Sequence, residues 1–221
     1  MTQLSFQLPH LTAMGAADFY ISDSNGEAVA WLDRWPRWPH PALVFWGPQG
    51  SGKTHLAHVW QARSHALFTT ASALPAESQN VILDFSNRLP KTPQEEIDLL
   101  HFMNSCYQNN NWLLLLSREA PTRWNIQLPD LRSRLNAIPL ARIDEPDDAL
   151  LSFVLAKHFS DRQLPVRDEI INYLVKRIDR SFQAVTDIVD CIDRLQLQTK
   201  RPFGLSLARD CLKNIHKDQG I

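Results

Sequence analysis

Residues 42–54 read Ala-Leu-Val-Phe-Trp-Gly-Pro-Gln-Gly-Ser-Gly-Lys-Thr, and this stretch decides the fold. Its first five residues form an unbroken apolar run that enters a glycine, which predicts a strand buried on both faces of a parallel sheet. The remaining eight residues satisfy the pattern GxxxxGK[ST] in full. Residues 53–64 then continue with helical spacing. A strand, a glycine-rich loop and a helix in this order are typical of a phosphate-binding P-loop.

Each residue type in this loop has a role in binding phosphate. Glycines let the loop close around phosphates, and backbone N–H groups at a helix N-terminus supply oriented positive dipoles. Lys53 is predicted to neutralise the β- and γ-phosphate oxygens, and the Thr54 hydroxyl to ligate Mg²⁺. We expect the nucleotide to contact Gly47, Pro48, Gln49, Gly50, Ser51, Gly52, Lys53, Thr54 and His55. The alternative to a phosphate site is an ordinary strand-to-helix turn in which the lysine occurs by chance. Such a turn does not require the complete GxxxxGK[ST] pattern.

A second apolar stretch ends in a carboxylate. Residues 81–84 read Val-Ile-Leu-Asp, which predicts a core strand that ends at Asp84. A carboxylate in this position can hold the magnesium ion beside a P-loop. A structural alternative is an aspartate that caps the loop after the strand. Thr54 and Asp84 are therefore the candidate Mg²⁺ contacts.

Two further segments carry candidate catalytic side chains. The apolar run at 113–116 ends in Ser117, which is placed to sense a γ-phosphate, although turn chemistry explains this serine equally well. Residues 128–135 read Leu-Pro-Asp-Leu-Arg-Ser-Arg-Leu, with arginines at 132 and 134. An arginine here would complete a neighbouring subunit's site as a finger, and we choose Arg134. A solvated arginine on an exposed helix end is the alternative.

Alternating elements predict a three-layer α/β fold with a five-stranded parallel sheet. The remaining expected strands are 66–70, 81–85, 112–117 and a weaker one at 137–140, and the expected helices are 53–64 and 93–108. After an acidic linker that contains Pro146, only helical spacing occurs, at 149–159, 167–177, 182–196 and 206–215. We therefore expect an N-terminal peptide at 1–12, a nucleotide-binding domain at 13–145 and an all-helical lid at 146–221.

Composition excludes several classes of protein. The 221 residues have a formal net charge of −1, which gives no general attraction for nucleic acid or anionic lipid. Three widely spaced cysteines without a CxxC pattern predict neither a disulfide framework nor a zinc site. No apolar run is long enough to span a bilayer, so we expect a cytoplasmic protein without a membrane partner. The seven tryptophans are interpreted as packing residues.

With these residues assembled, the chain resembles the DnaA branch of the AAA+ proteins, and within it the short regulators of the Hda type. The segment 47–56 resembles the family's Walker A motif, and 128–135 resembles the box that contains its arginine finger. The resemblance implies ATP or ADP with Mg²⁺ as cofactor, and it implies that Phe19 and Asn25 help to hold the adenine. It also places a sensor-2 residue at the start of the third lid helix, at Arg180 or alternatively at Thr186.

The same resemblance implies partners and a weak enzyme. The N-terminal residues Gln3, Leu4 and Phe6 resemble a peptide that docks on the DNA polymerase sliding clamp, and the second implied partner is the DnaA initiator. Phe85 stands where most hydrolytic AAA+ proteins have a second acid, so we expect slow intrinsic hydrolysis. Because the chain ends at Ile221 without a helix-turn-helix domain, we expect no sequence-specific DNA binding. Self-association is left open.

The sequence is compatible with two other functions. One is a DnaA-like adaptor or loading factor that recruits replication proteins without stimulating hydrolysis. The other is a small-molecule kinase, against which the finger box and the helical lid both argue. The expected function is that of an adenine-nucleotide-binding regulator of replication initiation that binds the clamp and promotes hydrolysis of DnaA-bound ATP.

Overall fold

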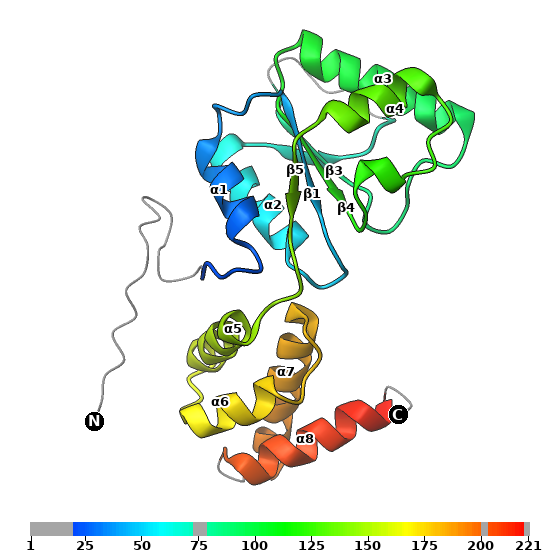
Figure 1. The fold of residues 1–221 in the computed structure, drawn as a ribbon. Helices are drawn as coiled ribbons and strands as arrows, with labels where there is room; N and C mark the ends of the chain where they lie inside the picture. Colours follow the sequence, from blue (N-terminus) through cyan, green and yellow to red (C-terminus); the bar gives the residue numbers. More distant parts are fainter. Residues whose placement is uncertain (1–19, 73–78, 200–202, 219–221) are drawn as a thin grey trace.

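The computed structural model describes residues 20–72, 79–199 and 203–218. Within these ranges the chain forms an α/β part and an all-helical part, which lie one below the other in Figure 1. The predicted clamp-binding residues and Phe19 lie outside the described residues.

The α/β part is built on five parallel strands, as the sequence predicts. The strands are β1 (Ala42–Trp46), β2 (Leu67–Thr69), β3 (Val81–Asp84), β4 (Leu113–Ser117) and β5 (Leu140–Arg142). Their order across the sheet is β2-β3-β4-β1-β5. Strand β1 pairs with the central strand β4 on one side and with the edge strand β5 on the other, so the loop that follows β1 leaves the interior of the sheet.

Helices cover both faces of this sheet. On one side lie α1 (Gly26–Arg34) and α2 (Lys53–Ser64), and on the other lie α3 (Pro93–Gln108) and α4 (Pro129–Ala137), joined to β4 through the short helix η1 (Pro121–Arg123). Alternate residues of β1 enter the two cores, with Leu43 and Phe45 packed toward α1 and α2, and Ala42 and Val44 toward α3 and α4. The apolar run is therefore buried on both faces, which is the predicted three-layer arrangement.

The structure shifts one predicted strand and contains one helix that was not predicted. The fifth strand was expected at 137–140, but Ala137 ends α4 and β5 runs from Leu140 to Arg142. Pro139 lies just before the strand, where its carbonyl accepts a hydrogen bond from Val44 N–H at 3.0 Å and its missing N–H is not needed. Helix α1 was not predicted, because its start at Asn25-Gly26 has the composition of a turn.

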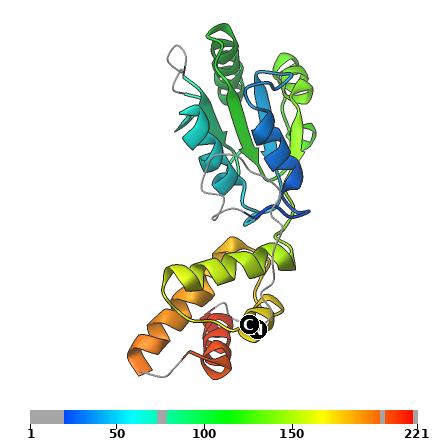
Figure 2. The same cartoon turned by 90° about the vertical axis from the view of Figure 1, so that its left-hand side faces the viewer.

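The helical part contains α5 (Asp148–Asp161), α6 (Asp168–Val175), α7 (Phe182–Thr199) and α8 (Leu205–Asp218). It has its own core, in which the largest buried aromatic ring is that of Phe159. The acidic linker begins α5, because the Asp147 side chain accepts a hydrogen bond from Leu150 N–H at 2.8 Å. Figure 2 shows this part as a separate layer of helices below the sheet.

The tryptophans of the α/β part pack against one another. The Trp38 ring stacks on Trp60 with centroids 5.4 Å apart, and Trp35 and Trp112 meet this pair edge to face. These rings belong to the core between the sheet, α1 and α2. The interpretation of the tryptophans as packing residues is therefore confirmed for this group.

The three cysteines are unpaired thiols, and the described helices include no membrane span. Cys106, Cys191 and Cys211 are free, and burial raises the pKa of the Cys106 thiol to about 12, which keeps it protonated at neutral pH. Across residues 20–72, 79–199 and 203–218, no helix has both the length and the apolar content needed to cross a bilayer.

Candidate nucleotide-binding site

The loop between β1 and α2 needs glycine at three positions. Gly50 and Gly52 have φ angles of 79° and 94°, in the left-handed region that side chains disfavour. Gly47 is required for a different reason, since a Cβ atom there would lie 1.9 Å from the backbone oxygen of Ile143. The chain that leaves β5 therefore passes directly against the start of the loop.

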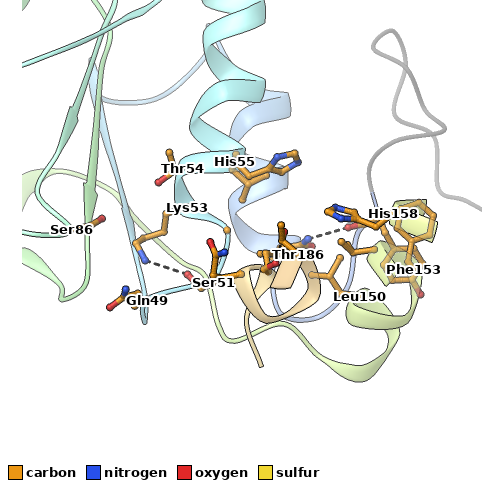
Figure 3. A pocket seen from close by; sticks show the side chains of 18 of the residues that line it. Gln49, Ser51, Lys53, Thr54, His55, Ser86, Leu150, Phe153, His158 and Thr186 are labelled. Carbon is orange, nitrogen blue, oxygen red and sulfur yellow. Dashed lines mark hydrogen bonds between the residues drawn. The ribbon is translucent and has the colours of Figure 1, made fainter. Parts of the chain in front are cut away.

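The ammonium group of Lys53 lies inside this loop. Its Nζ donates hydrogen bonds to the carbonyl oxygens of Gly47 at 2.9 Å and Pro48 at 2.6 Å, and a longer one to Ser51 Oγ at 3.3 Å (Figure 3). The side chain is buried, which lowers its pKa; Asp84 opposes that shift and Arg118 adds to it. A cation held in this way is already positioned for phosphate oxygens.

The start of α2 adds backbone donors to this cation. Gly52 is the N-cap residue and offers no side chain to accept hydrogen bonds from the first turn of the helix. The first backbone N–H that bonds within the helix is that of Leu56, which donates to Gly52 O at 3.0 Å. The amides of residues 53–55 therefore face the loop at the positive end of the helix dipole, which suits an anion.

A cavity of about 610 Å³ lies between the α/β part and the helical part. Several predicted residues line it: Asn25, Gln49, Gly50, Ser51, Gly52, Lys53, Thr54, His55, Asp84 and Thr186. Others do not belong to its lining: Gly47, Pro48, Ser117, Arg134 and Arg180. The cavity is therefore formed by the P-loop, the end of β3, and the helices α5 and α7.

Asp84 lies at the phosphate end of the cavity and also caps a turn. Its Oδ1 accepts a hydrogen bond from Ser86 N–H at 2.8 Å, as the structural alternative expects, but the residue is exposed and lines the cavity. The ring of Phe85 packs on that of Trp124, with centroids 5.4 Å apart, in the core between the sheet, α3 and α4. The residue after Asp84 thus belongs to the core, and it offers no second acid at the cavity.

Ser117 was the predicted site residue at the end of β4, but its neighbour Arg118 is the residue that lines the cavity. Ser117 is 1% exposed, and its Oγ accepts a hydrogen bond from Glu119 N–H at 3.3 Å, which is turn chemistry. Arg118 lines the cavity, and its Nη2 donates to Asn87 Oδ1 at 3.1 Å. Sequence reasoning missed Arg118, although the argument from the strand end applied to both residues.

The opposite end of the cavity is aromatic and apolar. The rings of Tyr20 and Phe153 stack with centroids 5.1 Å apart, and both line the cavity beside Leu150. Asn25 is buried, and its side-chain amide donates to Tyr20 O at 3.0 Å, so it fixes the segment that carries the tyrosine. An apolar, aromatic wall of this kind suits a nucleobase. Tyr20 and Phe153 were not among the predicted site residues.

His158 lines the same end of the cavity. Its Nδ1 is buried and has no hydrogen-bond partner among the described residues, and the side chain lies beside Phe153 (Figure 3). Burial lowers the pKa of His158, so the neutral ring is favoured there.

The start of α7 touches the loop directly. Phe182 N–H donates to Gly50 O at 3.4 Å, and the Phe182 ring packs over Gly52. Of the two residues considered for sensor 2, Thr186 lines the cavity, whereas Arg180 forms an ion pair with Asp148, Nη2 to Oδ1 at 2.7 Å. Arg180 also donates to the carbonyl of Pro146 at 3.2 Å, so it ties the start of α7 to the linker and to the start of α5. Gln183, which was not predicted, lines the cavity.

The two arginines of the 128–135 box have different environments. Arg132 Nε donates to the carbonyl of Ile126 at 2.9 Å, so this side chain holds its own loop. Arg134 is half-buried, and its guanidinium forms an ion pair with the neighbouring surface carboxylate of Asp130, Nε to Oδ1 at 3.1 Å. An exposed pair of this kind is weak and is easily exchanged for another anion.

Comparisons with known proteins agree on the fold. No family model matches the chain. An uncharacterized protein of Haemophilus influenzae is 25% identical over 188 residues, which cover 78% of this chain and 81% of that protein. Domain III of the replication initiation protein DnaA from Thermotoga maritima superposes with a TM-score of 0.73 at 15% identity, over 89% of this chain and 94% of that one.

Two longer solved structures give the same result. AMPPCP-bound DnaA from Aquifex aeolicus has a TM-score of 0.63 at 17% identity, over 80% of this chain and 64% of that one. The Holliday junction branch migration motor RuvB from Thermotoga maritima also has a TM-score of 0.63, at 16% identity, over 85% of this chain and 65% of that one. The chain thus spans about two thirds of these longer proteins. At such identities the likeness shows an AAA+ fold of the DnaA and RuvB type.

Proposed function

We propose that this protein is an adenine-nucleotide-binding AAA+ regulator of replication initiation. The observation that carries the proposal is one cavity with two chemically different ends. Lys53 and the P-loop amides form a cationic end, and the stacked rings of Tyr20 and Phe153 form an apolar end. A nucleoside polyphosphate has the same division, with a flat base at one end and a chain of anionic oxygens at the other. DnaA, which shares the fold, has been solved with AMPPCP bound.

Magnesium fits the phosphate end of this cavity. Thr54 supplies a hydroxyl and Asp84 a carboxylate, which are hard oxygen donors of the kind that Mg²⁺ prefers. The ion would neutralise phosphate charge there. Because Phe85 belongs to the core, the described residues offer no acid beside Asp84 to orient an attacking water. We therefore propose slow intrinsic hydrolysis, with the nucleotide acting as a structural ligand between the two parts.

Arg134 is the group proposed to act on a partner. It lies outside the protein's own cavity, and its guanidinium is paired with the exposed carboxylate of Asp130. We propose that it enters the nucleotide site of ATP-bound DnaA and stabilises charge that develops during hydrolysis of that ATP. The N-terminal residues Gln3, Leu4 and Phe6 are proposed to dock on the sliding clamp, which rests on the sequence alone.

The test is hydrolysis of DnaA-bound ATP in the presence of clamp loaded on DNA. We expect the wild-type protein to accelerate hydrolysis, and the Arg134→Ala variant to lose most of this acceleration, at least about tenfold for a missing arginine finger. Arg63→Ala is the matched control, because Arg63 also pairs with an exposed carboxylate, that of Asp33, but on α2. Equal hydrolysis with Arg134→Ala and Arg63→Ala would remove the finger assignment.

The alternative function is an adaptor that recruits replication proteins without stimulating hydrolysis. The position of Arg134 favours the regulator, since an adaptor does not need a guanidinium outside the cavity that can leave a weak surface ion pair. Clamp binding separates the two functions further. If Gln3→Ala and Leu4→Ala leave co-migration with the clamp unchanged, the regulator loses its proposed means of recruitment.

A further inference from the structure

Two of the three cysteines meet in the core of the helical part. Cys191 lies in the middle of α7 and Cys211 in the middle of α8, and these two helices pack side by side (Figure 1). The Cys191 thiol donates a hydrogen bond to the backbone carbonyl of Cys211, with sulfur and oxygen 4.0 Å apart. The two residues are 20 positions apart in the sequence, so helix packing is what brings them together.

The two thiols also contact each other. Burial raises the pKa of the Cys211 thiol, and a hydrogen bond with the Cys191 thiol raises it further. A hydrogen bond between thiols means that the side chains are directed toward each other and that the two sulfur atoms are neighbours. A disulfide requires this arrangement before its bond can form.

The two thiols differ in their access to solvent. Cys211 is fully buried, whereas Cys191 is half-buried. Because oxidation of cysteine depends on exposure, a dissolved oxidant meets Cys191 first. Cys211 lies behind it as a second thiol that can react with the oxidised sulfur. Cys106 belongs to a different core, between the sheet, α3 and α4, and is also fully buried.

We propose that Cys191 and Cys211 are a redox-sensitive pair that forms a disulfide on exposure to a peroxide. The Cys191 sulfur attacks one peroxide oxygen, the O–O bond breaks, and Cys191 becomes a sulfenic acid while the other oxygen leaves as water with the thiol proton. The Cys211 sulfur then attacks the Cys191 sulfur, the S–O bond breaks, and a second water leaves with the Cys211 proton. The two thiols lose two electrons and two protons, and hydrogen peroxide is reduced to water.

The disulfide acts on the helix that touches the nucleotide site. Helix α7 begins at Phe182, whose ring packs over Gly52 of the P-loop, and Thr186 of the same helix lines the cavity. A bond at Cys191 braces this helix against α8 and leaves the cavity lining in place, because neither thiol lines the cavity. The inference therefore does not depend on the proposed function.

The experiment treats the reduced full chain with hydrogen peroxide, alkylates the remaining thiols and maps disulfides by mass spectrometry after tryptic digestion without reductant. Trypsin releases Cys191 within residues 181–194 and Cys211 within residues 210–213, so the disulfide joins two separate peptides. We expect these linked peptides, from a single chain, to be the main oxidised product and dithiothreitol to separate them. The inference is wrong if Cys191 and Cys211 are recovered alkylated or as sulfinic acids, or if the disulfide joins two chains.

Three serine variants assign the roles of the thiols. Cys106→Ser is the matched control, because it removes a buried thiol of the α/β part, and it should form the linked peptides as the wild type does. Cys211→Ser should stop at the Cys191 sulfenic acid, so labelling of Cys191 by dimedone should be severalfold stronger than in the wild type. Cys191→Ser should form neither the linked peptides nor a dimedone adduct at Cys211.

Equal dimedone labelling of Cys191 in the wild type and in Cys211→Ser would show that Cys211 does not react with the oxidised sulfur, and would overturn the proposal. The mapping in the wild type needs no substitution. It therefore decides the question even if a serine in the core of the helical part prevents a variant from folding.

Discussion

Gly47 has no space for a side chain, because the chain leaving β5 occupies the place of its Cβ atom. Replacement by alanine must push the P-loop and the backbone at Ile143 apart. We expect Gly47→Ala to lower the free energy of unfolding by at least about 1–3 kcal/mol, the usual cost of local backbone strain. Urea denaturation without nucleotide measures this effect apart from ligand binding.

Gly204→Ala is the matched control for this substitution. A Cβ atom at Gly204 would meet no atom within 4 Å, so its stability should change by no more than about 0.5 kcal/mol. A Gly47→Ala protein as stable as the Gly204→Ala protein would show that the loop can move away from β5 without cost.

At the level of single residues, the sequence predicted the loop better than the far side of the cavity. Lys53 and Thr54 belong to a contiguous pattern whose chemistry fixes their roles. Tyr20 and Phe153 come from segments more than 100 positions apart, and only the packing of α5 against the α/β part brings their rings together. No local sequence pattern indicates such a pair. Asn25, which binds the backbone of Tyr20, was predicted only from the family resemblance.

Helix α4 depends on a carboxylate from another helix. Glu96 of α3 is 3% exposed, and its two oxygens accept hydrogen bonds from Gln127 N–H and Leu128 N–H, the shortest at 2.7 Å. These amides precede α4, so Glu96 anchors the N-terminus of the helix that carries Arg134. Glu96→Ala would leave buried donors unsatisfied, and we expect a loss of about 1–3 kcal/mol in unfolding free energy.

Two companions separate this anchoring from general damage to α3. Glu96→Gln keeps one acceptor oxygen and should lose less stability than Glu96→Ala. Asp98→Ala removes a surface acceptor of Gln94 on the same helix and should change stability by no more than about 0.5 kcal/mol. Three variants of equal stability would rule out Glu96 as the anchor of α4.

Element boundaries were predictable where a strong local signal marks them. Helix α3 has a capping box in which Thr92 Oγ1 accepts from Glu95 N–H, followed by Pro93 at its first position, and its predicted ends agree with the structure. The fifth strand was misplaced because three-residue strands have no periodicity to read. Helix α1 was missed, although Ala28, Val29 and Leu32 carry helical spacing, because a turn signal at its start outweighed it.

At the scale of the whole molecule, the α/β part and the helical part meet around one cavity. The P-loop contributes one wall, and α5 and α7 contribute the other. Direct contacts also join them, including the packing of Phe182 over Gly52. A ligand that binds both walls adds its binding free energy to this junction, about 2.7 kcal/mol at a concentration of 100 times Kd.

The clustering of tryptophans has a spectroscopic consequence for this junction. All seven indoles precede residue 125, and positions 146–218 contain none, so fluorescence emission monitors one part of the protein only. Far-ultraviolet circular dichroism detects α5 to α8 as well. We expect saturating ATP to raise the melting temperature measured by fluorescence and by circular dichroism, and to make the two melting curves coincide. In the Lys53→Ala variant, ATP should neither raise the melting temperature nor make the curves coincide. Curves that stay apart with ATP bound would mean that the nucleotide leaves the two halves thermally uncoupled.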